Sequence, residues 1–268
     1  MTRTATLWLV VGVIATIQGP TILAQPYAEF VARGAIDPAA RRTAEEAVLY
    51  SLASMARLGA TLEPRPKVYF AATTSDCVDV HIELGGTRDY GNRRCRLYSG
   101  MTWPGIFALN MENVRARNRD PIEAMWGLMP HELFHLYQWQ TGMFTIGTPW
   151  AFQEAPADLH KLKVLDERRI ISFSAYAKAT VLPRARTGRR NQPQFSIQAN
   201  VPPTDQTLGD WYALETALGL YLHENGGWPK IMVLHVSGAT TFAARFVEVY
   251  GRPLAEFEQE FFTWLARQ

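Results

Sequence analysis

The segment from Met129 to His135 contains two histidines and a glutamate in an order suited to metal chemistry. His131 and His135 are four residues apart, so on a helix both imidazoles project from one face and can bind one ion. Glu132 would then lie beside that ion. Two neutral imidazoles leave room for a third protein ligand and a water, which is the open coordination of catalytic zinc sites. An amphipathic helix that merely packs its two histidines is the alternative interpretation.

Two carboxylates on the next predicted helix fit this motif. A short connection after the first helix allows the second to return antiparallel and present Glu154 to the two histidines. Asp158 comes four residues later and lies on the same helical face. A zinc-bound imidazole needs an acceptor for its other ring N–H, and a carboxylate meets that need. We therefore expect Glu154 as the third ligand and Asp158 as the hydrogen-bond partner of His131.

These residues resemble a known family. The string HELFH at 131–135 is followed by a second motif that resembles that of the gluzincins, the thermolysin-like clan of zinc metallopeptidases, and in particular their small bacterial peptidase-MA-type domains. The second motif consists of Trp150, Glu154, Ala155, Ala157 and Asp158. The segments 212–226 and 246–265 are similar to the family's later helices, so the resemblance covers roughly residues 65–268.

The resemblance implies a zinc-dependent peptide hydrolase with one Zn²⁺ per chain. The implied ligands are His131, His135 and Glu154, and the implied general base is Glu132. Such a base takes a proton from the zinc-activated water and later delivers it to the leaving amine. Asp158 would orient His131 by accepting a hydrogen bond from the ring N–H that does not face the zinc.

The family also uses a donor for the oxyanion of the tetrahedral intermediate, and Tyr212 matches that position. A tyrosine packed in the core beside Trp211 is the alternative. Other histidines were weighed as site residues: His160 lies off the face of Glu154 in a helical projection, and His223 and His235 fall later in the helical region.

The chain departs from the family pattern in two respects. Ala155 and Pro156 replace the family's usual glycine and its neighbour. The domain is also too short for the large substrate-binding lobe of full thermolysin-type enzymes. Substrate, cleavage preference, endo- or exopeptidase action and oligomeric state therefore stay open.

Composition and the N-terminal sequence bear on compartment and partners. Arg3, the apolar run 5–17 and the small residue Ala24 resemble a secretory signal spanning residues 1–24, and the run is shorter than the roughly 20 residues that cross a bilayer. An uncleaved anchor is the alternative.

The net charge of +2 gives no argument for nucleic acid or an anionic membrane surface. In an exported chain Cys77 and Cys95 predict a disulfide, with two free buried thiols as the alternative.

Hydrophobic periodicity predicts an α+β, zincin-like fold. We expect an N-terminal helical segment at 25–64, and a domain at 65–268 with a small mixed or antiparallel sheet on the motif helix and a mainly helical C-terminal part. Aromatic and β-branched residues predict a strand at 67–71, alternating apolar residues predict one at 78–84, and an apolar run predicts one at 101–109. Because Pro104 falls within the last of these, we place it at the sheet edge next to the substrate. The segment 183–203, rich in arginine and proline, is predicted to be an exposed loop or lid.

Together these features predict an exported, periplasmic or extracellular zinc metallopeptidase whose partner is a peptide or protein substrate. No stable association with a membrane is expected once the signal is removed. Two other functions remain open at this point. One is a non-catalytic binding or scaffold protein on a peptidase-like fold, although such a protein has no need of Glu132. The other is a zinc amidase that acts on cell-wall peptides, since both reactions attack an amide carbonyl.

Overall fold

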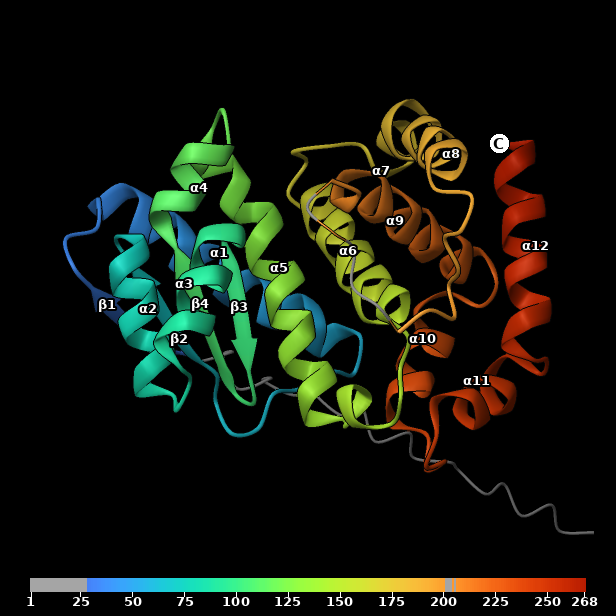
Figure 1. The fold of residues 1–268 in the computed structure, drawn as a ribbon, viewed down its shortest axis with the longest axis horizontal. Coiled ribbons are helices and arrows are strands. Elements are labelled where there is room, and N and C mark those ends of the chain that lie inside the picture. The colour runs from blue at the N-terminus through green and yellow to red at the C-terminus, as the bar shows by residue number, and fades with distance from the viewer. Residues whose placement is uncertain (1–27, 201–203, 205) are drawn as a thin grey trace, which may run out of the picture.

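The computed structural model describes residues 28–200, 204 and 206–268. A sheet flanked by helices forms one part, and a helical part packs beside it (Figure 1). The strands are β1 (Glu29–Arg33), β2 (Lys67–Ala71), β3 (Gly100–Trp103) and β4 (Ile106–Asn110). The helices of the first part are α1 (Pro38–Arg57), α2 (Thr74–Glu83), α3 (Arg88–Leu97), α4 (Met111–Arg117) and α5 (Pro121–Gln140). Those of the second part are η1 (Met143–Thr145), α6 (Trp150–Glu167), α7 (Phe173–Tyr176), η2 (Ala177–Val181), α8 (Leu182–Asn191), α9 (Leu208–Glu224), α10 (Gly227–Val236), α11 (Phe242–Tyr250) and α12 (Leu254–Arg267).

The sheet is mixed and has the order β1-β2-β4-β3. Strands β1, β2 and β4 are parallel, and β3 pairs antiparallel with β4 at one edge. The expectation of an α+β chain with a small mixed sheet and a mainly helical C-terminal part is confirmed. Strand β1 was not expected, and it brings the segment before residue 65 into the same sheet.

Both faces of the sheet are covered. On β4, Phe107 and Leu109 point into the core formed with α1 and α5, whereas Ala108 points to the opposite face, against α2. The same alternation occurs on β2. Because successive strand residues face opposite sides, the two central strands have to be apolar throughout, and they are. This packing fixes α5 against the sheet next to the edge strand β3.

The predicted strand at 78–84 is wrong. Residues 74–83 form α2, and a second helix, α3, follows it. Thr73 caps α2 in a capping box with Asp76, which starts a helix at the point where the alternating pattern had suggested a strand. Val78 and Val80 are both buried although they point to different sides of the helix, because Val78 packs with the disulfide and Met101 while Val80 packs with Tyr69 and Ala108 of the sheet.

The predicted single strand at 101–109 is two strands. Pro104 and Gly105 form the turn of the hairpin between β3 and β4, with Gly105 at a φ of +72°. The proline therefore marks a turn and not an edge strand. Of these two strands, β3 lies at an edge of the sheet, opposite the edge formed by β1, and β4 is interior.

A further expectation needs correction. Part of the predicted loop at 183–203 is helix α8, which packs on α9. Helix α5 includes Pro130 and carries the histidine motif in its second half.

The predicted disulfide between Cys77 and Cys95 is confirmed; it joins α2 to α3. The predicted signal at 1–24 lies outside the described residues. Among residues that the structure describes, no helix has the length and apolar character needed to cross a membrane.

Helices α6 and α9 approach closely at Gly219. A Cβ atom added there would lie 2.6 Å from the carbonyl oxygen of Ala155, which is backbone and cannot rotate away. This approach places the side chains of Tyr212 and Thr216, earlier on α9, beside α6.

We predict that Gly219→Ala lowers the thermal midpoint of unfolding. The overpacking cost of about 1–3 kcal/mol exceeds the gain of about 1 kcal/mol that alanine brings to a helix interior. Thermal denaturation followed by circular dichroism measures the difference. Gly209→Ala, in the first turn of the same helix, is the control, since a Cβ there meets no atom within 4 Å. Equal midpoints for the two variants would contradict the prediction.

Candidate metal centre

The two histidines of α5 and the glutamate of α6 meet between these helices. One donor atom from each of His131, His135 and Glu154 lies within 4.8 Å of the others. The Nε2 atoms of the two histidines are 3.1 Å apart, and Glu154 Oε2 is 3.2 Å from the first and 3.6 Å from the second. All three side chains are buried. No other group of three or more metal-ligating side chains of this kind occurs in the described part of the chain.

Asp158 fixes the orientation of His131. Its Oδ1 lies 3.0 Å from His131 Nδ1, and the carboxylate also accepts hydrogen bonds from Lys161 and Thr216. The aspartate is 1% exposed. Burial by itself would raise its pKa, but Lys161 and His131 outweigh burial and hold the pKa far below the usual value. The carboxylate is therefore ionised and keeps a proton on His131 Nδ1.

A glutamine plays the same part for His135. Gln138 Oε1 lies 2.7 Å from His135 Nδ1, and the glutamine amide in turn donates to the carbonyl of Gln153 at 2.8 Å. Gln138 is fully buried. The sequence interpretation did not include it. Its position three residues after His135, on the same helical face, was the available signal.

These partners decide where the ring lone pairs point. In each histidine the Nδ1 faces an oxygen acceptor, so in the neutral ring Nδ1 carries the hydrogen and Nε2 carries the lone pair. Two nitrogen lone pairs and Glu154 Oε2 thus converge on one point. That oxygen is buried and accepts no well-aligned hydrogen bond from a described residue. Such a set repels itself unless a cation lies between its members, so the residues fit a divalent metal ion.

Protons are the competing cations at this point. Burial lowers the pKa of His131, but its contacts with the carboxylates of Asp158 and Glu154 outweigh burial and raise the pKa to about 10. The pKa of His135 is also raised, because the charge of Glu154 outweighs burial. A metal ion would have to displace these protons, as is usual for histidine ligands.

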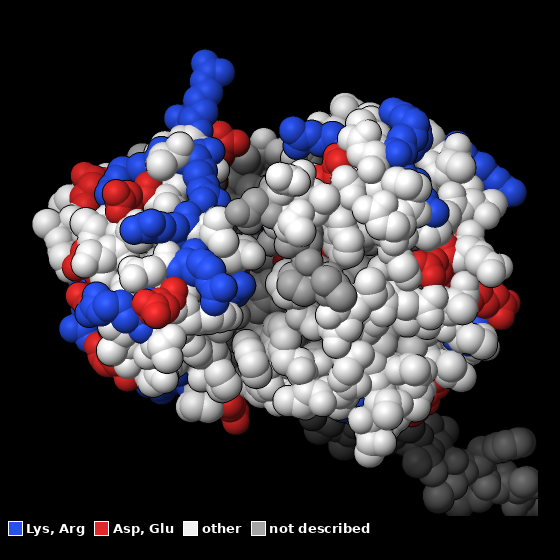
Figure 2. Space-filling view, in the orientation of Figure 1, with Lys and Arg blue, Asp and Glu red and all other residues white. Residues whose placement is uncertain are grey.

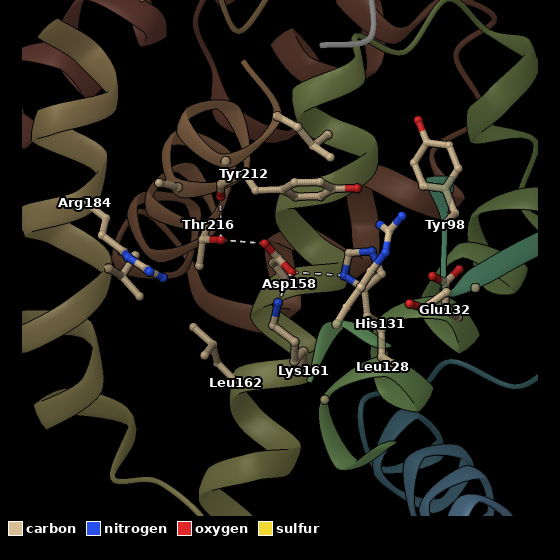
Figure 3. A pocket seen from close by; sticks show the side chains of 18 of the residues that line it. Tyr98, Leu128, His131, Glu132, Asp158, Lys161, Leu162, Arg184, Tyr212 and Thr216 are labelled. Atoms are coloured by element: carbon tan, nitrogen blue, oxygen red, sulfur yellow. Dashed lines mark hydrogen bonds and ion pairs between the residues drawn. The ribbon is translucent and has the colours of Figure 1, made fainter. Parts of the chain in front are cut away.

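Glu132 faces a cavity beside the histidines. The cavity has a volume of about 430 Å³ and lies between the β3 edge and helices α8 and α9. Figure 3 shows the carboxylate of Glu132 on the side of Tyr98, with His131 next to it. Burial raises the pKa of Glu132, an effect that the two motif histidines oppose. Its carboxylate forms no hydrogen bond with a described side chain or backbone group and is free to bind a water.

The edge strand leaves room for this carboxylate. A Cβ atom at Gly100 would lie 2.4 Å from Glu132 Oε1 and 2.5 Å from Glu132 Cδ. Glycine is therefore required where β3 begins, because any larger residue would displace the Glu132 side chain. This requirement could not be read from the sequence, since the two residues come from different elements.

Tyr212 lines the same cavity from α9. Figure 3 shows its ring directed toward the side of His131 and its hydroxyl in the cavity. Burial and the charge of Glu154 raise its pKa well above the usual value, so the phenol keeps its proton and can donate a hydrogen bond. The structure thus brings Tyr212 to the site.

The three other histidines that were considered do not join the cluster. His160 is buried and donates from Nδ1 to the carbonyl of Pro130 at 2.9 Å, and burial lowers its pKa to about 4. His235 bonds the carbonyl of Ile231 in the same way, with the same low pKa. His223 is exposed, at a ring contact with Phe173.

Glu215 is an acid that the sequence interpretation did not include. It is fully buried between α9 and the site, and neither carboxyl oxygen has a hydrogen-bond partner among the described residues. Burial and the charges of Glu154 and Asp158 raise its pKa well above the usual value, so the site favours the neutral, protonated form of this group. An acid on the apolar face of a predicted helix was the available signal.

Comparisons with known proteins add no assignment. No protein-family model, curated protein or solved structure matches the chain. What the site can do is therefore inferred from its geometry.

We predict that Glu215→Gln gains stability relative to the wild type as pH rises. The folded state holds a proton on Glu215 that the unfolded chain releases above its ordinary pKa of 4.5, so the wild type loses stability from about pH 5 upward. In the variant, the side chain at position 215 has no proton to release. The two should be equally stable near pH 4 and diverge by roughly tenfold in the folding equilibrium for each further pH unit.

Urea denaturation of metal-free protein at several pH values measures this difference. Glu256→Gln is the control, because Glu256 is an exposed glutamate on α12. If Glu215→Gln and the control both follow the wild-type pH profile, Glu215 is not a buried neutral acid.

Proposed function

We propose that this chain is a zinc-dependent metallopeptidase of the gluzincin type, with a zincin-like fold. One observation carries the proposal: the buried lone pairs of His131, His135 and Glu154 converge beside a cavity into which Glu132 projects. Two imidazoles and one carboxylate form a ligand set suited to catalytic zinc, and they leave a coordination position open for water. A purely structural site would need neither that open position nor a free carboxylate next to it.

Each residue has a distinct part in the proposed reaction. His131, His135 and Glu154 would hold the zinc, which would supply a water of lowered pKa and polarise the scissile carbonyl. Glu132 takes the proton from the attacking water and later donates it to the leaving amine. Asp158 and Gln138 keep His131 and His135 in the tautomers that the ligand role requires.

Tyr212 would stabilise charge that develops on the carbonyl oxygen. Its protonated hydroxyl lies in the cavity and has no hydrogen-bond partner within the described structure, so it is free to donate to substrate. A donor placed in advance in a partly buried site is worth more than one in water.

Export of this enzyme is part of the proposal. The disulfide between Cys77 and Cys95 supports it, because such bonds persist mainly in oxidising compartments. The resemblance of residues 1–24 to a secretory signal points the same way.

We predict that purified protein binds about one zinc per chain and hydrolyses peptides, and that Glu132→Gln keeps the zinc but loses at least about a hundredfold in rate. Gln has the same size and cannot accept the proton. Metal analysis and a quenched-fluorescent peptide library measure the two effects. Glu123→Gln, an exposed position on the same helix, should behave as wild type. A metal-free wild type, or equal cleavage by Glu132→Gln, would refute the proposed function.

We also predict that Gly100→Ala reduces hydrolysis without reducing stability or zinc content. The new methyl group would meet the end of the Glu132 side chain, which can rotate away at little energetic cost but then leaves its working position. Thermal midpoint, zinc content and kcat are the measurements. Gly238→Ala is the control, since a Cβ there meets no atom within 4 Å. Unchanged kcat in Gly100→Ala would show that the position of Glu132 does not depend on the edge strand.

A further inference from the structure

The cavity beside the metal centre carries basic groups that the proposed reaction does not use. Arg117, Lys161 and Arg184 all line it, together with the acids Glu132 and Asp158. The positive charge of Lys161 is balanced by the carboxylate of Asp158, with which it forms an ion pair. In the described residues neither arginine forms an ion pair with a carboxylate.

Arg117 is fixed at one side of the cavity. Its guanidinium donates to the carbonyls of Leu97 and Arg96, at 2.5 and 2.7 Å. Carbonyl oxygens hold the side chain in place without cancelling its charge. Arg94 lies nearby on α3, over the ring of Tyr98 at 4.3 Å, and its charge opposes the rise that burial causes in the pKa of Glu132. Positive charge thus collects on the α3 and α4 side of the cavity.

Arg184 faces the cavity from the other side, on α8. Figure 3 shows its side chain directed toward Thr216, with Asp158 and then His131 beyond. The guanidinium is exposed and forms no hydrogen bond or ion pair with any described residue. Figure 2 shows basic side chains on both margins of the hollow between the two parts of the molecule.

The other arginines of the same helix are directed elsewhere. Arg189 donates to the carbonyls of Pro193 and Phe195 and lies over the ring of Phe262. Arg190 donates to Thr187. Neither they nor Arg186 line the cavity. Of the four arginines that cluster in the sequence at 184–190, only Arg184 is placed to meet a ligand there.

The cavity also has apolar side chains in its lining, which are Leu128, Leu162, Val181 and Leu208. A cavity of about 430 Å³ is within the size range of small-ligand sites, in which a few polar groups on apolar walls fix orientation. A guanidinium without an ion-pair partner in such a cavity matches a planar carboxylate, which it can bind through two parallel hydrogen bonds.

We propose that Arg184 is a specificity residue that binds a carboxylate of the substrate, so that the cavity selects peptides with a negative charge near the bond to be cleaved. This inference rests on the proposed peptidase function and adds the class of substrate to it. The carboxylate is either the side chain of an Asp or Glu residue or the C-terminus of the peptide, because both present the same group to a guanidinium.

The test measures binding without turnover. Zinc-loaded full-length Glu132→Gln is titrated with three fluorescent peptides of one apolar sequence: a C-terminal amide, the same amide with one internal Asp, and the free acid. Arg184→Gln and Arg186→Gln are each combined with Glu132→Gln. We expect at least one of the two carboxylate peptides to bind roughly tenfold more tightly than the plain amide, as expected for a hydrogen-bonded charge pair.

Arg184→Gln should abolish that preference and leave affinity for the plain amide unchanged, whereas Arg186→Gln should keep it. Raising the salt concentration should weaken the preference, because the guanidinium is exposed. Preference for the Asp peptide identifies an acidic side chain as the source, and preference for the free acid identifies the C-terminus. Equal binding of all three peptides would overturn the inference. A preference that survives Arg184→Gln, as for a carboxylate bound to zinc itself, would overturn it as well.

Failure of this inference can be told apart from failure of the proposed function. Wild type that cleaves all three peptides equally well is a peptidase without carboxylate selection. Wild type that cleaves none, while Arg184 still discriminates in binding, recognises carboxylates but is not a peptidase.

Discussion

The structure depends on the convergence of two imidazole nitrogens and one carboxylate oxygen in a buried space. His131, His135 and Glu154 are brought within 4.8 Å of one another although burial makes like partial charges costly to hold together. Hydrogen bonds behind the site set this arrangement, since Asp158 and Gln138 each bind the far nitrogen of one ring. As a result, the Nε2 atom of each histidine carries a lone pair and has no hydrogen-bond donor among the described residues. A cation at their meeting point relieves the conflict, whether it is a metal ion or a proton.

The rest of the fold supplies the walls of that site. Helix α5 is held between the sheet and α6, so the histidines point away from the sheet and toward Glu154. Helix α9 approaches α6 closely enough at Gly219 for Thr216 to reach Asp158. The edge strand approaches from the other side, and its Gly100 touches Glu132. The contacts made by α9 and by the edge strand join elements far apart in the chain, so the complete site exists only when both parts of the molecule are folded together.

Local pattern predicted most of the helices and the disulfide, and it failed where short elements had ambiguous signals. Residues 78–84 alternate apolar and polar like a strand, yet the capping box at Thr73 and the nearby sheet make 74–83 a helix. Pro104 was interpreted as an edge-strand proline, whereas it turns the chain between β3 and β4. Strand β1 was missed because five residues carry too little periodicity to stand out. In each case neighbouring elements decided between two locally acceptable structures.

The sequence by itself determined the chemistry that is available. The spacing of His131, Glu132 and His135 places two imidazoles on one helical face, and the spacing of Glu154 and Asp158 does the same for two carboxylates, because helical periodicity is a local property. Tertiary structure alone decided which groups meet. It buried Glu215 without a hydrogen-bond partner among the described residues, set Gly100 against Glu132, and turned only one of four clustered arginines into the cavity. These placements depend on how separate elements pack, and no spacing along the chain encodes them.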